Sequence, residues 1–228
     1  MKILIVTPFL PYLCATHAGG ISVFESIKAI SKDHEVYLFS RIEPFEINYV
    51  ADLKPFCKEV HFYIFETPAS RNPVSIIFSY MILGMKAHRL MKENAFGLVQ
   101  AEFTETGFAM RSPSIPSVFV AYDVISKPAK RRLYVSKTLR KKIFNALRFK
   151  VTRLVELFIS RKFAKVLAMP DGYRKVLLYL NRAIDAEVSP NLLHPDFDVY
   201  VGYAGGEAET LLFAGAMHRD VNVEAVPA

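Results

Sequence analysis

The chain has 228 residues, 52% of them hydrophobic, which excludes global disorder because the apolar material is ample for a core. Its formal net charge is +7, and its two cysteines, Cys14 and Cys57, exclude a disulfide framework or a cysteine metal motif. We therefore expect reduced thiols in a cytoplasmic protein. No targeting segment is predicted, and the longest apolar stretch, 74–85, is shorter than the roughly 18–20 residues of a membrane span.

The chain begins with a strand, a loop and a helix. Residues 2–6 form an apolar, β-branched run that predicts a buried strand, and a loop with two prolines follows over 7–18. Gly19 and Gly20 come next, and apolar residues at helical spacing then predict a helix over 21–30. Glycines before a helix N-terminus favour binding of an anion such as phosphate, and a tight turn is the alternative interpretation. The sequence lacks both G-x-G-x-x-G and the P-loop pattern here.

Strands and helices continue to alternate along the chain. Strands are predicted over 35–39, 59–65, 97–103, 117–122, 165–168 and 186–189, and helices over 73–91, 134–163 and 173–180. This order predicts an α/β fold with a doubly wound parallel sheet of Rossmann-like type. Ligands of such sheets bind beyond the carboxyl ends of the strands, so we expect Gly19–Gly20, 102–105 and 122–123 to line one crevice.

A basic segment covers 124–155, which contains no acidic residue. Apolar residues at three- and four-residue spacing predict that much of it belongs to the long amphipathic helix over 134–163. A solvated helix face is one interpretation of the charge. The other is peripheral binding to an anionic membrane surface at the inner face of the membrane, through Arg140, Lys141 and Lys142. Nucleic acid is not expected as a partner, because no recognition motif accompanies the charge.

The C-terminal part changes in composition. We predict a Rossmann-like domain over 1–190, an interdomain linker over 191–209 and the first strand and turn of a second domain over 210–228. Because such a β-α unit cannot bury its own apolar faces, we expect the chain to be truncated there.

Several segments together resemble retaining glycosyltransferases of the two-Rossmann-domain (GT-B) type, specifically family 4. They are KILIVTPFLP with HAGG, VQAEF, the Tyr122–Asp123 pair, FAKVLAMPDGYRKVL, SPNLLHPDFD and LLFAGAMHRDVNVEAV. Two positions depart from the family pattern: Leu192 stands in place of a glycine, and Tyr122 in place of a histidine.

The resemblance implies that this chain is the acceptor-side half of a sugar transferase. Its substrates would be a nucleotide-sugar and a glycan or lipid-linked acceptor, with no cofactor, and its catalytic residues would lie in the missing C-terminal domain. Gly19, Gly20 and His17 would bind the donor phosphates. The chain alone would be inactive. A non-catalytic partner subunit of a split glycosyltransferase, or a truncated gene product without activity, is the alternative.

Three carboxylates are candidates for acceptor binding: Glu102, Asp123 and Glu105. At strand ends they could bind acceptor hydroxyls or assist a proton transfer. Capping of the helices that follow is the other interpretation of Glu102 and Asp123. No cluster of residues in the sequence suggests a metal site.

Overall fold

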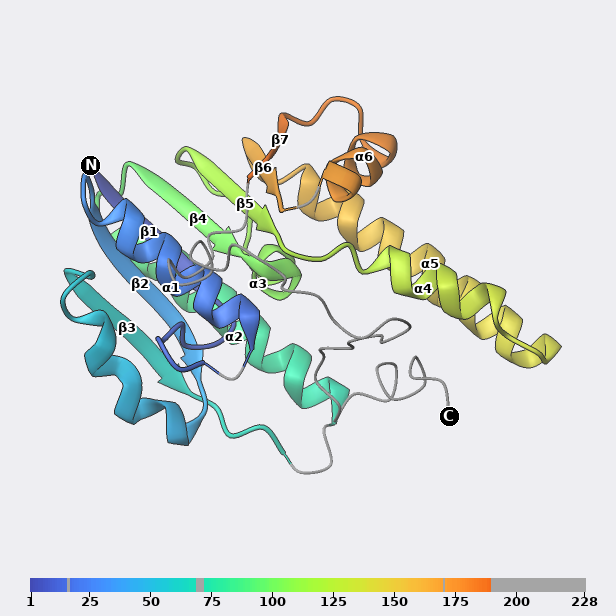
Figure 1. The fold of residues 1–228 in the computed structure, drawn as a ribbon, viewed down its shortest axis with the longest axis horizontal. Coiled ribbons are helices and arrows are strands. Elements are labelled where there is room, and N and C mark those ends of the chain that lie inside the picture. The colour runs from blue at the N-terminus through green and yellow to red at the C-terminus, as the bar shows by residue number, and fades with distance from the viewer. Residues whose placement is uncertain (16, 69–71, 170, 190–228) are drawn as a thin grey trace, which may run out of the picture. The chain divides into compact units, whose positions relative to one another are not determined.

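The computed structural model describes residues 1–15, 17–68, 72–169 and 171–189, and in them it places a seven-stranded parallel sheet (Figure 1). The strand order is β3-β2-β1-β4-β5-β6-β7. The strands are β1 (Lys2–Thr7), β2 (Glu35–Ile42), β3 (Glu59–Ile64), β4 (Leu98–Glu102), β5 (Ser117–Ala121), β6 (Lys165–Ala168) and β7 (Ala186–Val188). The predicted α/β class and doubly wound parallel sheet are therefore confirmed.

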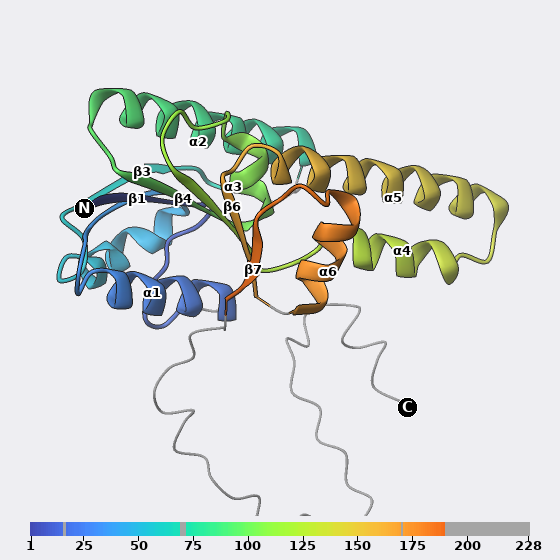
Figure 2. The same cartoon turned by 90° about the horizontal axis from the view of Figure 1, so that it is seen from above.

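Helices connect the strands and cover both faces of the sheet. They are α1 (Ala18–Ile30), the 3-10 helix η1 (Pro44–Leu53), α2 (Pro73–Glu93), α3 (Phe103–Ala109), α4 (Ser126–Tyr134), α5 (Leu139–Ser160) and α6 (Asp171–Leu180). Figure 2 shows α1 on one side of the sheet and α2, α3 and α5 on the other. None of the described helices combines the length and the apolar composition that crossing a bilayer requires.

The core has two layers because strand side chains alternate between the two faces of the sheet. Ile3 and Ile5 of β1 pack in one cluster with buried residues of α1, such as Ile27. Leu4 and Val6 pack in the other cluster, with buried residues of α2, α5 and α6. The alternation within β1 thus explains why an almost continuous apolar run serves two cores.

Several predicted element boundaries differ from the structure, and two of these differences affect the basic segment and the end of β4. The long helix predicted over 134–163 corresponds to α5, which begins only at Leu139, and the separate helix α4, which ends at Tyr134, was not predicted. Thr138 has extended backbone angles, and its hydroxyl accepts a hydrogen bond from the Lys141 N–H, which is the geometry of an N-cap. The strand predicted over 97–103 ends at Glu102, because Phe103 has a φ of 68° and begins α3.

The linker predicted over 191–209 and the second domain predicted over 210–228 lie outside the described residues. They stay predictions.

Candidate functional site

The site lies at the point where the order of the strands in the sheet reverses. β1 has β2 on one side and β4 on the other, so the connections that follow β1 and β4 leave toward opposite edges. A crevice outside the carboxyl ends of the strands is expected at such a point. The segment after β1 brings His17, Gly19 and Gly20 there, β4 brings Glu102, and β5 is followed by Tyr122 and Asp123.

His17 caps helix α1. It has extended backbone angles, and its Nδ1 accepts a hydrogen bond of 2.9 Å from the Gly20 N–H. Helix α1 begins at Ala18, three residues earlier than the sequence predicts, so Gly19 and Gly20 lie in its first turn rather than before it. In this arrangement the His17 side chain caps the helix and orders the two glycines.

A row of aromatic rings connects the loop after β1 to the end of β5. Phe9 contacts the His17 ring at a centroid distance of 4.2 Å and the Phe103 ring at 4.8 Å, and Phe103 stacks on Tyr122 at 4.1 Å. The left-handed backbone of Phe103, with its φ of 68°, is uncommon for a non-glycine residue. Backbone strain of this kind is found preferentially at functional sites.

Glu102 is the most unusual carboxylate of the site. It is fully buried, and its Oε1 accepts a hydrogen bond of 2.5 Å from Gln100 Nε2. Burial raises the pKa of Glu102 from 4.5 to about 7, although nearby Gln100 and Tyr122 act in the opposite direction. Glu102 Oε2 and the Tyr122 hydroxyl make no hydrogen bond of standard geometry among the described residues, but the two groups are close enough to act on each other's pKa, and Ser22 acts on that of Tyr122. A buried polar atom without a full set of partners is costly, so these two atoms are suited to receive a ligand or water.

The side chains of Glu102 and Tyr122 border a small cavity of about 190 Å³ between α1 and the sheet. Its walls also include polar groups from α1, β4 and the segment after β7, namely Ser26, Gln100 and Ser189. Burial, followed by the Glu102 carboxylate, raises the pKa of Tyr122, which keeps its hydroxyl protonated and able to donate.

Glu105 and Asp123 lie elsewhere at the same edge and are exposed. The Tyr173 hydroxyl donates to Asp123 Oδ1 at 3.4 Å. Loss of hydration, and then the charge of Asp123, raise the pKa of Glu105, so the two carboxylates are near one another. Glu105 and Asp123 are thus exposed at the edge, whereas Glu102 lies in the interior.

The structure does not support helix capping as the role of Glu102 and Asp123. Glu102 precedes α3 but makes no side-chain capping bond to it. At α4 the Ser126 N–H donates instead to Glu156 Oε1 of α5, at 2.8 Å. Within the described part of the chain, no group of three or more histidine, cysteine or acidic residues could hold a metal ion.

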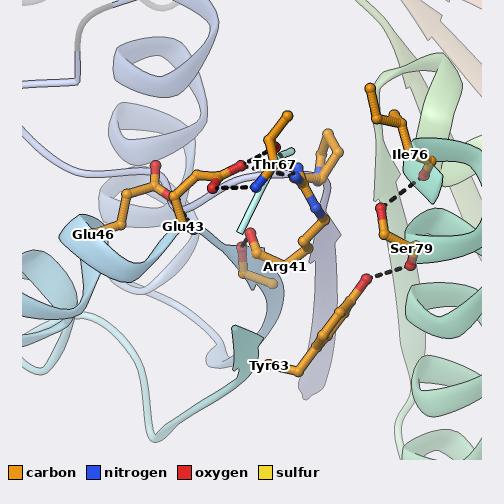
Figure 3. A network of polar contacts seen from close by, with 9 residues as sticks. Arg41, Glu43, Glu46, Tyr63, Thr67, Ile76 and Ser79 are labelled. Atoms are coloured by element: carbon orange, nitrogen blue, oxygen red, sulfur yellow. Dashed lines mark hydrogen bonds and ion pairs between the residues drawn. The ribbon is translucent and has the colours of Figure 1, made fainter. Parts of the chain in front are cut away.

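A buried polar network beside the site surrounds Arg41, at the end of β2 (Figure 3). Arg41 Nη2 lies 2.8 Å from Glu43 Oε1 and 2.7 Å from Thr67 Oγ1, and Nη1 lies 3.4 Å from the Pro8 carbonyl oxygen. Thr67 also bonds Glu43, through its N–H at 3.0 Å and through its hydroxyl. The guanidinium thus holds the start of the loop after β1 against the segment that follows β3.

The predicted membrane-facing residues Arg140, Lys141 and Lys142 lie in the first turn of α5 and are exposed. An apolar stripe runs along the same helix, with side chains 50–75% exposed. We call it the α5 stripe, and its members are Leu139, Ile143, Phe144, Leu147, Val151, Leu154 and Phe158.

Sequence reasoning missed the aromatic row, the Arg41 network and the pairing of Glu102 with Gln100. Gln100 and Glu102 are two residues apart on one strand, and this spacing could have placed both side chains on the same face of the sheet. Nothing local in the sequence signals the left-handed backbone of Phe103.

Comparisons with known proteins agree with this fold. No protein-family model matches the sequence, and no curated protein matches it. A sucrose-phosphate synthase from Thermosynechococcus elongatus superposes with a TM-score of 0.55 at 14% identity, over 83% of this chain and 47% of that one. Arabidopsis thaliana UGT89C1, solved in complex with UDP-L-rhamnose, gives a TM-score of 0.50 at 9% identity, over 85% and 49%. The chain thus spans about half the length of these structures and shares with them a Rossmann-like parallel α/β fold.

Proposed function

We propose that the chain is the acceptor-side half of a retaining glycosyltransferase, which moves a sugar from a nucleotide-sugar to a glycan or lipid-linked acceptor. The observation that carries the proposal is the buried Glu102 at the carboxyl end of β4, whose Oε2 makes no hydrogen bond of standard geometry within the described residues and which borders a cavity beneath α1. Two proteins of the same fold agree with it, one named a synthase of sucrose phosphate and one solved with UDP-L-rhamnose. A fold by itself does not fix a function, so the argument rests on the site.

In this proposal each group at the edge has a distinct role. Gly19 and Gly20 allow donor phosphates to approach the first turn of α1, where the helix dipole stabilises negative charge. Glu102 accepts a hydrogen bond from an acceptor hydroxyl, with Tyr122 as a donor beside it. A carboxyl with a pKa of about 7 exchanges protons readily at neutral pH, which suits a group that receives a hydroxyl proton. Asp123 and Glu105 bind further hydroxyls at the exposed rim.

The catalytic groups of the donor side would belong to a second domain, so the 228-residue chain alone is expected to bind acceptor without transferring sugar. The competing hypothesis is a non-catalytic partner subunit, or a product without activity. It predicts no transfer from any form of the protein.

The test is a transfer assay on the protein purified from its natural source, with a panel of labelled nucleotide-sugars and with glycan and lipid extracts of the same cells as acceptors. We expect label in one acceptor fraction, at least a tenfold loss of kcat/KM for Glu102→Gln, and no change for Glu35→Gln, an exposed carboxylate at the start of β2. Absence of transfer and of donor hydrolysis across the panel would overturn the proposal.

We also propose that the α4–α5 pair docks on an anionic membrane surface. The α5 stripe is exposed, and the basic residues of 124–155 flank it with Glu156, buried, as the first acidic residue beyond them. Exposed apolar side chains beside clustered Lys and Arg are typical of helices that lie in a lipid interface. Reversing Arg140, Lys141 and Lys142 to Glu should abolish sedimentation with phosphatidylglycerol vesicles, and unchanged sedimentation would leave a solvated helix face as the interpretation.

A further inference from the structure

Helices α4, α5 and α6 lie at one end of the sheet (Figure 1) and line an open pocket of about 590 Å³. Its wall contains five cationic side chains, three aromatic rings and no carboxylate. We call it the helical basic pocket. The cations are Lys127, Lys130, Arg131, Arg153 and Lys175, and the rings are Tyr134, Phe149 and Tyr179.

Among the described residues, only one of the five cations has an anionic partner. Lys175 Nζ lies 2.6 Å from Asp171 Oδ2. In the part of the chain that the structure describes, no carboxylate lies within ion-pair distance of Lys127, Lys130, Arg131 or Arg153. Burial raises the pKa of the nearby Glu156, and the charge of Arg153 opposes this shift. The Glu156 carboxylate accepts its hydrogen bond from the Ser126 N–H rather than from Arg153. Like charges gathered around a concave surface create a positive potential that attracts an anion of high charge.

The aromatic rings of the pocket are arranged beside these cations. The Arg153 guanidinium lies 5.7 Å from the centroid of the Phe149 ring and 5.6 Å from that of Tyr179, and Lys130 Nζ lies 5.9 Å from that of Tyr134. Tyr134 and Tyr179 are 74% and 75% exposed, so their rings offer apolar surface to a ligand. Val176 and Leu180 of α6 add aliphatic surface to the same wall.

We propose that the helical basic pocket binds a phosphate or diphosphate ester that carries an apolar or aromatic group. The unpaired lysines and arginines match the charge and the oxygen atoms of the phosphoryl part, and the tyrosine and phenylalanine rings pack on the organic part. The volume falls within the range of sites for small ligands. The pocket shares no wall residue with the Glu102 cavity, so the proposal stands independently of glycosyl transfer.

Two sources could supply this chemistry: a soluble nucleotide and a lipid phosphate. Uridine 5′-diphosphate and farnesyl diphosphate, the latter below its micelle concentration, represent them in isothermal titration calorimetry with the 228-residue chain. Inorganic diphosphate is the third probe and lacks an organic group. We expect at least one ester to bind at least tenfold more tightly than inorganic diphosphate, and the tighter ester identifies the source.

The variants locate the binding. Lys130→Gln combined with Arg153→Gln should weaken binding of the tighter ester at least tenfold. Lys54→Gln combined with Lys92→Gln makes the same change of charge at exposed positions outside the pocket, and it should leave the affinity within twofold. Tyr179→Ala should weaken binding of the ester and leave the affinity for inorganic diphosphate unchanged. The proposal is overturned if neither ester binds, if inorganic diphosphate binds as tightly as both, or if both pairs of substitutions act equally. Circular dichroism of each variant establishes that it is folded.

Discussion

Gly19 in the first turn of α1 faces the ring of Phe103, and a Cβ at Gly19 would lie 2.6 Å from Phe103 Cζ. The contact joins two segments far apart in the sequence, the helix after β1 and the first residue of α3. The Phe103 ring has little freedom to move away, because it stacks on Tyr122 and contacts Phe9. The absence of a side chain at Gly19 therefore allows the aromatic row and the α1 N-terminus to meet.

Gly19→Ala should destabilise the protein by about 1–3 kcal/mol, the usual cost of forcing extra volume into a packed site. A glycine-to-alanine change inside a helix would otherwise favour folding by up to about 1 kcal/mol. Gly172→Ala is the matched control, because Gly172 also lies in the first turn of a helix and a Cβ there meets only Lys127 Nζ, at 3.6 Å. Urea denaturation measures both variants. Equal midpoints for the two would show that the ring of Phe103 yields without cost, and a smaller effect of Gly19→Ala in a Phe103→Leu background would confirm the contact.

Glu102 should give the protein a pH-dependent stability. The folded-state pKa of about 7 lies above the ordinary 4.5, so the folded protein holds this proton more tightly than the unfolded chain does. The contribution to the free energy of unfolding is therefore full below pH 4.5, decreases as the pH rises to about 7, and is constant above it. A difference of this size corresponds to about 3 kcal/mol.

Glu102→Gln removes the ionisation while keeping the shape of the side chain. Relative to the wild type, the variant should gain up to about 3 kcal/mol of stability between pH 4.5 and pH 8. Denaturation curves at half-unit pH intervals measure this gain, and Glu35→Gln, at an exposed position, controls for the change of net charge. A constant difference between variant and wild type across the range would show that Glu102 titrates as an ordinary carboxyl.

The sequence was sufficient for the strands and for helices α1, α2, α5 and α6 in their order, because hydrophobic periodicity and the α/β alternation are local signals. It did not predict the shorter helices η1, α3 and α4. It was also sufficient to bring Gly19, Glu102 and Asp123 to one edge, since strand ends in a parallel sheet share an edge. It could not show that Glu102 points into the interior while Asp123 stays exposed, because burial depends on α1 packing over the sheet. The helical basic pocket depends in the same way on how three helices pack.

Loss of the buried Arg41 side chain should lower the free energy of unfolding more than loss of the exposed Arg89 side chain does. Its side chain is 8% exposed, and loss of one partner of a buried ion pair leaves the other charge uncompensated, so Arg41→Met should cost about 3 kcal/mol. The cost of Arg41→Lys should be smaller than that of Arg41→Met but above zero, because an ammonium keeps the charge and cannot reproduce the bonds to Glu43, Thr67 and Pro8 together. Arg89→Met is the control: Arg89 Nε lies 2.7 Å from Glu93 Oε1, but the Arg89 side chain is 81% exposed. Its removal should cost less than about 1 kcal/mol in the same denaturation assay. Similar costs at both sites would mean that the Arg41 network is as weak as a solvated pair.

The α5 stripe should contribute to membrane binding through apolar contact, apart from the electrostatic attraction of the basic residues. Leu147→Ser combined with Leu154→Ser changes two stripe residues, 61% and 64% exposed, and leaves every charge in place. Because each buried methylene contributes about 0.8 kcal/mol, removing the two leucine side chains from the interface should weaken vesicle binding more than tenfold. The residual binding should still fall as salt increases, since the lysines and arginines remain. Co-sedimentation with phosphatidylglycerol vesicles at 50 and 300 mM salt, between which the Debye length falls by about 2.4-fold, measures both effects. Wild-type affinity in the serine variant would mean that the basic residues alone attach the helix and that the stripe serves another contact.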